Sequence, residues 1–130
     1  MNKDFQNWHT RKKMIHEQYV RVFFKEREIW FSFLGQNIGY EQDGRGFEFL
    51  RPVVIFKKFN NSVLWVIPLT KQTKEGIHYF SFFFFPRIRS TAVLSQLRLI
   101  DAKRLKYKVG NMKTEDFNSL KNKIRQLLPD

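Results

Sequence analysis

The stretch at residues 77–85 constrains the fold most, because it predicts a strand that is apolar on both faces. Three alternate phenylalanines share one face of this strand, whereas Phe83 and Phe85 lie on the other. Both faces must be covered, since a bare apolar strand promotes aggregation. We therefore expect the second face to pack under a helix or to form a subunit contact.

Other short runs rich in aromatic and β-branched residues also have the composition of strands. The pair Asn60 and Asn61 is a typical turn, so the two strands around it are predicted to form a hairpin. Gly110 is predicted to be a break, and residues 101–105 a single helical turn. The remaining strands are predicted at residues 28–34, 51–57, 63–68, 91–100 and 106–109.

Helical patterns lie at the two ends of the chain. Residues 3–20 show apolar side chains at helical spacing, and a final helix is predicted to begin with Thr114 as its N-cap and to end before Pro129. The order of elements predicts a mainly β fold, a barrel or a strongly bent sheet with a helix at each end. We divide the chain into an N-terminal helical extension, residues 1–26, and a barrel domain, residues 27–130.

The composition narrows the class of protein. A chain of 130 residues with 42% hydrophobic content fits one well-packed domain. It has no cysteine, which excludes disulfides, thiolate metal sites and a cysteine nucleophile, and it shows no export signal or membrane span, so we expect a cytoplasmic protein. The net charge of +12 favours a polyanionic partner, nucleic acid first and an acidic protein second, although many basic proteins are merely soluble.

The connection between the first two predicted strands is long and rich in glycine. It carries Glu41, Asp43 and Glu48 just ahead of Arg51. Loops of this length in compact domains tend to be functional or mobile. Two readings remain open: Arg51 forms a structural ion pair with one of these acids, or it stabilises an anionic transition state beside a carboxylate that transfers a proton.

Further polar residues follow the later strands. Thr70 leaves the third strand at the start of a basic loop, where a hydroxyl can contact phosphate, although threonine is also a common turn residue. Alternation within the strand predicted at residues 91–100 places Gln96 and Arg98 on one side. The histidines lack the spacing of metal ligands, and we expect His78 to be structural.

Taken in order, these motifs resemble the PemK/MazF-type toxins. The resemblance covers about residues 27–128 and rests on six segments in the same order. It implies an SH3-like β-barrel, a homodimer, and a metal-independent, sequence-selective endoribonuclease that is neutralised by an acidic antitoxin protein. The segments are REIWFSFLG, EQDG at Glu41, RPVVI at Arg51, VIPLT ending at Thr70, VLSQLR at residues 93–98 and DAKRL at residues 101–105.

The resemblance also implies roles for individual residues. Arg51 and Thr70 match the active centre, and Glu41 matches the acid of the Glu-Gln-x-Gly motif. The connection after Gly44 is longer than in the commonest members, so either Glu41 or Glu48 can face Arg51. No cofactor or metal is implied for the cleavage of single-stranded RNA by its 2′-hydroxyl group. Substrate contacts are predicted at Arg45, Lys71, Lys74, Gln96 and Arg98. Bases can stack on aromatic rings, and the candidates are Trp30, Tyr40, Phe47 and Phe49, although each is more often a core residue than a stacking platform.

Two other functions stay open. One is a non-catalytic relative that binds RNA or an antitoxin. The other is a gyrase poison like CcdB, which uses the same barrel but depends on a C-terminal aromatic anchor. This chain ends in Gln-Leu-Leu-Pro-Asp and has no such anchor, which disfavours the gyrase poison.

Overall fold

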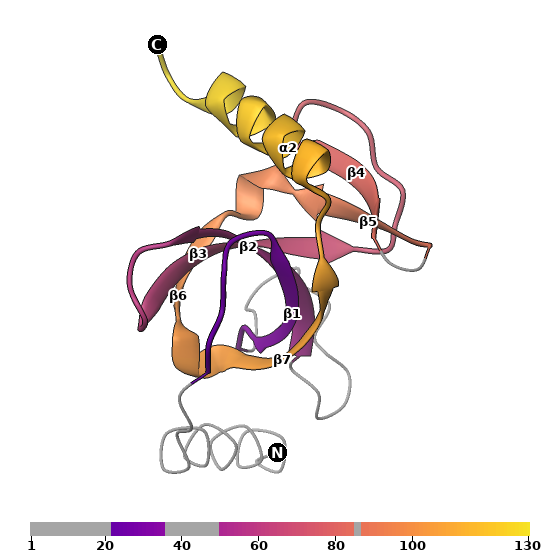
Figure 1. Ribbon diagram of the computed structural model, residues 1–130. Helices are drawn as coiled ribbons and strands as arrows, with labels where there is room; N and C mark the ends of the chain where they lie inside the picture. Colours follow the sequence, from indigo (N-terminus) through magenta and orange to yellow (C-terminus); the bar gives the residue numbers. More distant parts are fainter. Residues whose placement is uncertain (1–21, 36–49, 85–86) are drawn as a thin grey trace, which may run out of the picture.

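The computed structural model describes residues 22–35, 50–84 and 87–130, which form a barrel-like sheet and one helix (Figure 1). The predicted N-terminal helix at residues 3–20 lies outside the described residues. The strands are antiparallel to their neighbours in the sheet. They are β1 (Glu28–Phe33), β2 (Leu50–Lys58), β3 (Val63–Thr70), β4 (Tyr79–Phe84), β5 (Ile88–Val93), β6 (Arg98–Asp101) and β7 (Leu105–Asn111).

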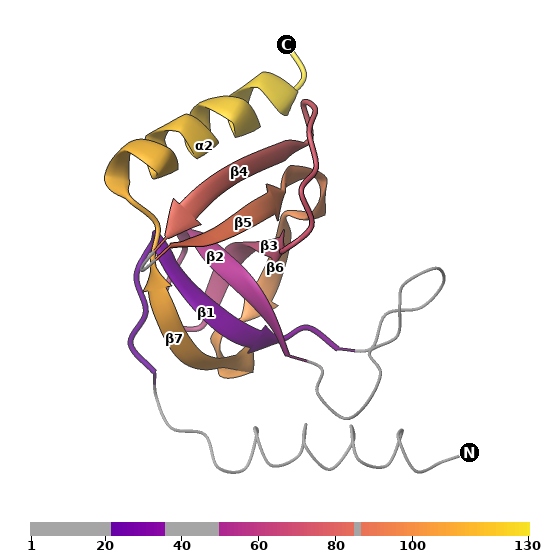
Figure 2. The same ribbon diagram turned by 90° about the vertical axis from the view of Figure 1, so that its right-hand side faces the viewer.

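Strand β3 is central to the barrel because it has neighbours along both edges. One edge pairs with β2, in the hairpin predicted from Asn60 and Asn61. The other edge pairs with β6 along its first half and with β5 at Leu69 and Thr70. The sheet therefore runs in the order β4, β5, β3, β2, β1, β7, with β6 also on β3. This change of partner turns β4 and β5 away from the barrel, under the C-terminal helix (Figure 2).

Two apolar cores lie on opposite faces of the same strands. Within β2, Val53 and Ile55 point into the barrel, whereas Val54 points toward the helix. This alternation follows from the period of two in a β-strand, and it explains why β2 reads as a continuous apolar run. The core inside the barrel consists of Phe24, Trp30, Val53, Ile55, Leu64, Val66, Ile100, Ala102 and Leu105.

The C-terminal helix α2 (Thr114–Leu127) covers the second core. Its buried residues Phe117, Leu120 and Ile124 recur at helical spacing and pack on the β4–β5 part of the sheet. The predicted cap was wrong by one residue: Lys113 is the N-cap, with no side-chain hydrogen bond, and Thr114 is the first helical residue. The acidic residues of the first turn, Glu115 and Asp116, complement the helix dipole.

The phenylalanine-rich strand β4 is covered on one face. Phe82 and Phe84 are buried in the core beneath α2, and their rings stack along the strand with Phe80. On the opposite face, the Phe83 side chain is 54% exposed. Within residues 22–35, 50–84 and 87–130 no helix covers Phe83, and the subunit contact stays a prediction for this face.

The predicted strand at residues 91–100 was wrong. It is two strands, β5 and β6, separated by a 3-10 turn, η1 (Leu94–Gln96), because the Leu97 N–H bonds back to the carbonyl of Leu94. The turn moves the chain from the end of β3 that pairs with β5, at Leu69 and Thr70, to the first half of β3, which pairs with β6. The helical turn predicted at residues 101–105 is confirmed as the 3-10 turn η2 (Ala102–Arg104), which the Asp101 side chain caps.

Gly110 does not break a strand, contrary to the prediction, but lies within β7. A side chain at this position would place its Cβ 3.0 Å from Cδ2 of Phe84. Such a contact is tighter than most contacts between packed carbon atoms, so the Phe84 ring would have to shift by a few tenths of an ångström. The glycine therefore serves the packing of β7 against the second core.

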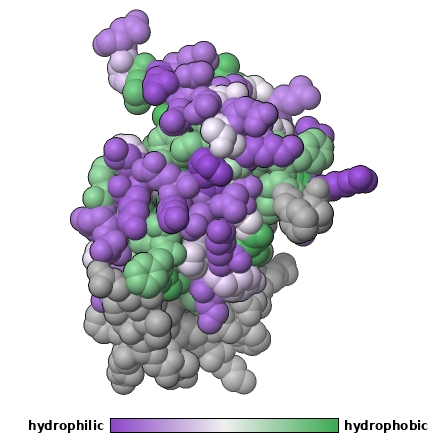
Figure 3. Space-filling model, viewed as in Figure 1, coloured by the Kyte–Doolittle hydropathy of each residue, from purple (hydrophilic) through white to green (hydrophobic). Residues whose placement is uncertain are grey.

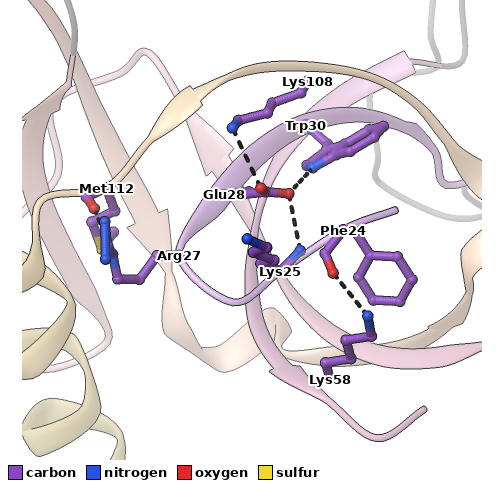
Figure 4. Close-up of polar contacts among 8 residues, drawn as sticks. All are labelled: Phe24, Lys25, Arg27, Glu28, Trp30, Lys58, Lys108 and Met112. Carbon is purple, nitrogen blue, oxygen red and sulfur yellow. Dashed lines mark hydrogen bonds and ion pairs between the residues drawn. The ribbon is translucent and has the colours of Figure 1, made fainter. Parts of the chain in front are cut away.

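A buried carboxylate helps to close one end of the barrel (Figure 4). Glu28 accepts hydrogen bonds from Trp30 Nε1 and from the backbone N–H of Lys25, both at 3.0 Å, and lies 3.3 Å from Lys108 Nζ. Burial alone would raise the pKa of Glu28, but these partners together lower it. The carboxylate is therefore held ionised and ties β1, β7 and the segment before β1 together.

Candidate functional site

Arg51 lies near the start of β2, at the end of the barrel opposite Glu28. It pairs across the sheet with Ser32 of β1 and is exposed. Alternation places its side chain on the same face as Val53 and Ile55, the face that lines the barrel interior. Within residues 22–35, 50–84 and 87–130, no carboxylate forms an ion pair with Arg51. Its guanidinium is thus presented to solvent at the mouth of the barrel.

Thr70 lies at the same end of the barrel on the neighbouring strand. The last pair between β2 and β3 joins Val53 to Pro68, and Arg51 and Thr70 each lie two residues beyond it. Both therefore belong to the same face of the sheet as this pair. The Thr70 Oγ1 atom accepts a hydrogen bond from the Gln72 N–H at 3.2 Å, which leaves the hydroxyl hydrogen available to a ligand.

A row of hydroxyl groups continues from Thr70 across the sheet. Thr70 pairs with the buried Thr91 of β5, and Thr91 pairs with Ser81 of β4. The Oγ atoms of Ser81 and Thr91 lie 2.8 Å apart, so these two hydroxyls satisfy each other. The strand that pairs with Thr70 is thus itself joined to β4 by a part-buried polar contact.

A second arginine, Arg104, lies beside this site and was not predicted as part of it. It ends η2, where its Nη1 donates to the carbonyl of Phe33 at 3.3 Å. Its own carbonyl accepts from Oγ of the fully buried Ser32 at 3.2 Å. Burial, then repulsion from Arg98, lowers the pKa of Arg104, while Asp101 acts in the opposite direction. Its position in the DAKRL segment was the only sequence signal, and only the fold brings it next to Ser32.

The four predicted substrate contacts among the described residues lie on exposed positions. Arg98 is the first residue of β6 and pairs with Val66, on the barrel-interior face. Gln96 belongs to the turn η1 rather than to a strand, so the alternation that was predicted to align it with Arg98 does not apply. Lys71 and Lys74 are exposed in the segment between β3 and β4.

The segment between β3 and β4 is fastened to α2. Lys123 donates to the carbonyls of Gly76 and Tyr79, at 3.3 and 2.8 Å. Lys74 lies over the Tyr79 ring, with its Nζ 5.9 Å from the ring centroid. His78 is exposed, and its backbone carbonyl accepts from the backbone N–H of Leu94. This contact does not involve the imidazole, so the structural role of the side chain stays a prediction. The basic loop is therefore held in place by contacts at its far end.

Several predicted residues lie outside the described residues: Glu41, Arg45 and Glu48, and the stacking candidates Tyr40, Phe47 and Phe49. Of the two roles that the sequence left open for the fourth candidate, Trp30, the structure shows the core residue and not the stacking platform. Its side chain is only 7% exposed and its indole N–H is bonded to Glu28, so it belongs to the barrel core. A base cannot stack on a ring that is enclosed in this way.

Much of the face seen in Figure 3 is hydrophilic, with smaller apolar areas between the polar side chains. In the part of the chain that the structure describes, no three His, Cys, Asp or Glu side chains come together as metal ligands. No helix among these residues is long and apolar enough to cross a membrane.

Comparison with solved structures gives the same fold. A toxin from Mycobacterium tuberculosis, MazF-mt6, aligns with a TM-score of 0.58 at 15% identity, over 77% of this chain and 94% of its own. MazF from Deinococcus radiodurans aligns with a TM-score of 0.58 at 14% identity, over 82% and 97%. A further Mtb toxin gives 0.54 at 15% identity, over 60% and 92%. The predicted barrel with a C-terminal helix is thereby confirmed.

The sequence itself identifies the family. No curated protein matches the chain. The sequence profile of the PemK-like, MazF-like toxins of type II toxin–antitoxin systems, however, matches residues 25–128, which is most of the chain. The resemblance inferred from the six motifs is thereby confirmed. The chain belongs to the PemK-like, MazF-like toxin family of type II toxin–antitoxin systems.

Proposed function

We propose that the protein is an endoribonuclease toxin that cleaves single-stranded RNA in the cytoplasm without a metal ion. Family membership supports a toxin with an antitoxin partner. The observation that carries the nuclease proposal is the placement of Arg51 and Thr70 two residues beyond the same strand pair, on the face that lines the barrel. A permanently charged guanidinium and a hydroxyl donor on one face suit a phosphodiester group.

In the proposed reaction, the 2′-oxygen of the RNA attacks the adjacent phosphorus while the bond to the 5′-oxygen of the next nucleotide breaks. The 2′-hydroxyl loses its proton to a base and the leaving 5′-oxygen gains one, giving a 2′,3′-cyclic phosphate and a 5′-hydroxyl end. Arg51 holds the negative charge on the non-bridging oxygens, and Thr70 orients the phosphate. We assign the proton transfer to Glu41 or Glu48.

Binding of the RNA strand and selectivity for particular sequences both require contacts beyond the reacting phosphate. We assign these contacts to Gln96 and Arg98 and to the basic residues Arg45, Lys71 and Lys74. The exposed positions of Lys71, Lys74, Gln96 and Arg98 support this assignment. The excess of positive charge over the whole chain supports attraction to RNA and to an acidic antitoxin.

We also propose that the protein acts as a homodimer. Phe83 of β4 is 54% exposed on the face of the sheet that α2 does not cover. An exposed phenylalanine in this position supports a contact with a second subunit, as expected for a strand that is apolar on both faces.

Cleavage of a mixed-sequence RNA in EDTA tests the nuclease proposal. The wild-type protein should cut the RNA. Arg51→Ala should cut it at least about 100-fold more slowly, by analogy with the loss of an oxyanion donor. Arg125→Ala is the matched control, because Arg125 is an exposed arginine of α2 bonded to Asn122. Equal rates for wild type and Arg51→Ala would end the assignment of Arg51. Intact RNA that binds in a salt-dependent manner would instead indicate a non-catalytic relative.

A further inference from the structure

Arg104 is an unusual residue for a barrel wall because its charged group is held half-buried by backbone contacts. One guanidinium nitrogen donates to the Phe33 carbonyl, at 3.3 Å, where β1 ends. The Arg104 carbonyl is itself held by Ser32 Oγ, so both ends of the residue are fixed to β1. A guanidinium has five N–H donors, and this contact uses one of them. The remaining donors are preorganised rather than free to rotate.

The position of Arg104 relates it to Arg51. Ser32, which holds the Arg104 backbone, is the cross-strand partner of Arg51, and on its other edge it pairs with Leu105 of β7. Neighbouring strands lie roughly 5 Å apart, so Arg51 and Leu105 are separated by about 10 Å across β1. Arg51 and Arg104 therefore lie on the same side of the barrel mouth, in β2 and directly before β7, the two strands that flank β1.

A second guanidinium faces the same region. Arg98 starts β6 on the barrel-interior face, is exposed, and repels Arg104 strongly enough to help lower the Arg104 pKa. Asp101 offsets this repulsion only in part, and its carboxylate also accepts the backbone N–H of Lys103 at 2.8 Å. Two cations kept close together cost free energy, which a bound anion would recover. Within the described ranges, neither arginine is neutralised by an ion pair.

We propose that Arg98 and Arg104 together bind one backbone phosphate of single-stranded RNA, separate from the phosphate cleaved beside Arg51. This inference rests on the proposed endoribonuclease function and names a second contact of the same substrate. A planar guanidinium fork suits phosphate oxygens, and a fixed fork loses less entropy on binding than a free lysine. The site would set the register of the RNA, because it would hold a phosphate other than the one that reacts.

Binding of an uncleavable nucleic acid tests the proposal apart from cleavage. The probe is a fluorescent pool of 12-nucleotide strands of random sequence with 2′-deoxyribose throughout, and the affinity is measured over a range of salt concentrations. Loss of one phosphate contact lowers the slope of log affinity against log salt by about 0.7 for a single strand. We expect this decrease for the double variant Arg98→Gln with Arg104→Gln, and no change for Arg125→Gln.

Kinetics separates this site from the catalytic one. With RNA as substrate, the double variant should show a raised KM with an unchanged kcat, whereas Arg51→Ala should lower kcat. Thermal melting checks the fold of each variant. If Arg104→Gln does not fold, Arg98→Gln alone, at an exposed position, must still weaken binding of the pool.

The outcomes distinguish the two proposals. In one outcome the wild-type protein binds the pool but cuts no RNA, and the double variant shows a smaller slope of log affinity against log salt. This outcome would remove the nuclease function and keep the phosphate site. A folded double variant with the wild-type slope and KM would overturn the phosphate site, whether or not RNA is cut. The latter result together with weaker binding of an acidic peptide would assign the two arginines to a protein partner instead.

Discussion

Arg51 and Thr70 lie on adjacent strands, each two residues past the Val53–Pro68 pair and on the same face of the sheet. Arg51 precedes this pair in β2, and Thr70 follows it in β3, which is what antiparallel pairing requires for two residues to meet at one end of a hairpin. The relationship is independent of the segment that joins β1 to β2. Strand pairing alone therefore places these two residues at one end of the hairpin.

The hydroxyl group of Thr70, rather than its size, should matter for cleavage. Thr70→Val keeps the shape of the side chain but removes the donor, so kcat/KM should fall at least tenfold, consistent with the loss of a hydrogen bond to a charged group. Thr70→Ser keeps the donor and should retain most of the activity. Initial rates of cleavage of one RNA substrate measure kcat/KM for the two variants and the wild-type protein. Similar rates for the valine and serine variants would show that the hydroxyl contributes nothing.

Glu28 should make stability depend on pH. Burial opposes its charge, yet the hydrogen bonds of Trp30 and Lys25 and the ion pair with Lys108 lower its pKa in the folded state. A lowered folded pKa gives stability that is present above the unfolded value of about 4.3 and is lost as the pH falls through the folded pKa. Glu28→Gln should therefore cost about 1 kcal/mol at pH near 7, and less in acid.

Urea unfolding of wild type and Glu28→Gln at several pH values measures this difference. Glu75→Gln is the control, since Glu75 is exposed in the segment between β3 and β4. A free-energy difference between wild type and Glu28→Gln that stays constant from neutral to acidic pH would contradict a charged Glu28 in the folded protein.

Gly110→Ala should destabilise the barrel through one clash. The added Cβ would lie 3.0 Å from Cδ2 and 3.3 Å from Cε2 of Phe84, whose ring is packed in the core beneath α2. Overpacking of this kind costs about 1–3 kcal/mol. In the presence of Phe84→Leu, the same alanine should cost much less, because the aromatic carbons it meets are gone. Additive free energies in this double-mutant cycle would show that the clash is relieved elsewhere.

Phe83→Ser should weaken self-association without unfolding the subunit. The ring is more than half exposed and takes no part in either core, so its loss removes little packing within one chain. Sedimentation velocity should show a shift from dimer to monomer for this variant. Leu128→Ser is the control, because Leu128 is also exposed and apolar but lies at the end of α2. A monomeric wild type would refute the homodimer.

Local patterns were sufficient for most of the fold. The composition that predicts β2 and β3, the Asn60 turn and the apolar side of α2 each depend on residues close together in the chain, and the structure confirms all three. The Asn60 side chain shows the reason, since its Oδ1 accepts from the N–H groups of Ser62 and Val63 and so forms the turn by itself.

Local patterns failed where a distant strand decides the outcome. The alternating pattern at residues 91–100 predicts one strand, but β3 pairs with β5 and β6 at separate positions, and the chain turns at Leu94–Gln96 to reach both. Gly110 reads as a break because glycine is rare in strands, whereas its small size is required by Phe84, from another strand.

The sequence by itself determined the family, the succession of strands and the candidate pair Arg51 and Thr70, because these depend on ordered motifs and on a period of two residues. Only the tertiary structure decided that Trp30 is enclosed beside a charged Glu28, and that Arg104 lies next to Ser32 and within the field of Arg98. The physical reason is register: which side chains meet across a barrel depends on hydrogen-bond pairing between strands far apart in the chain, and no local pattern specifies it.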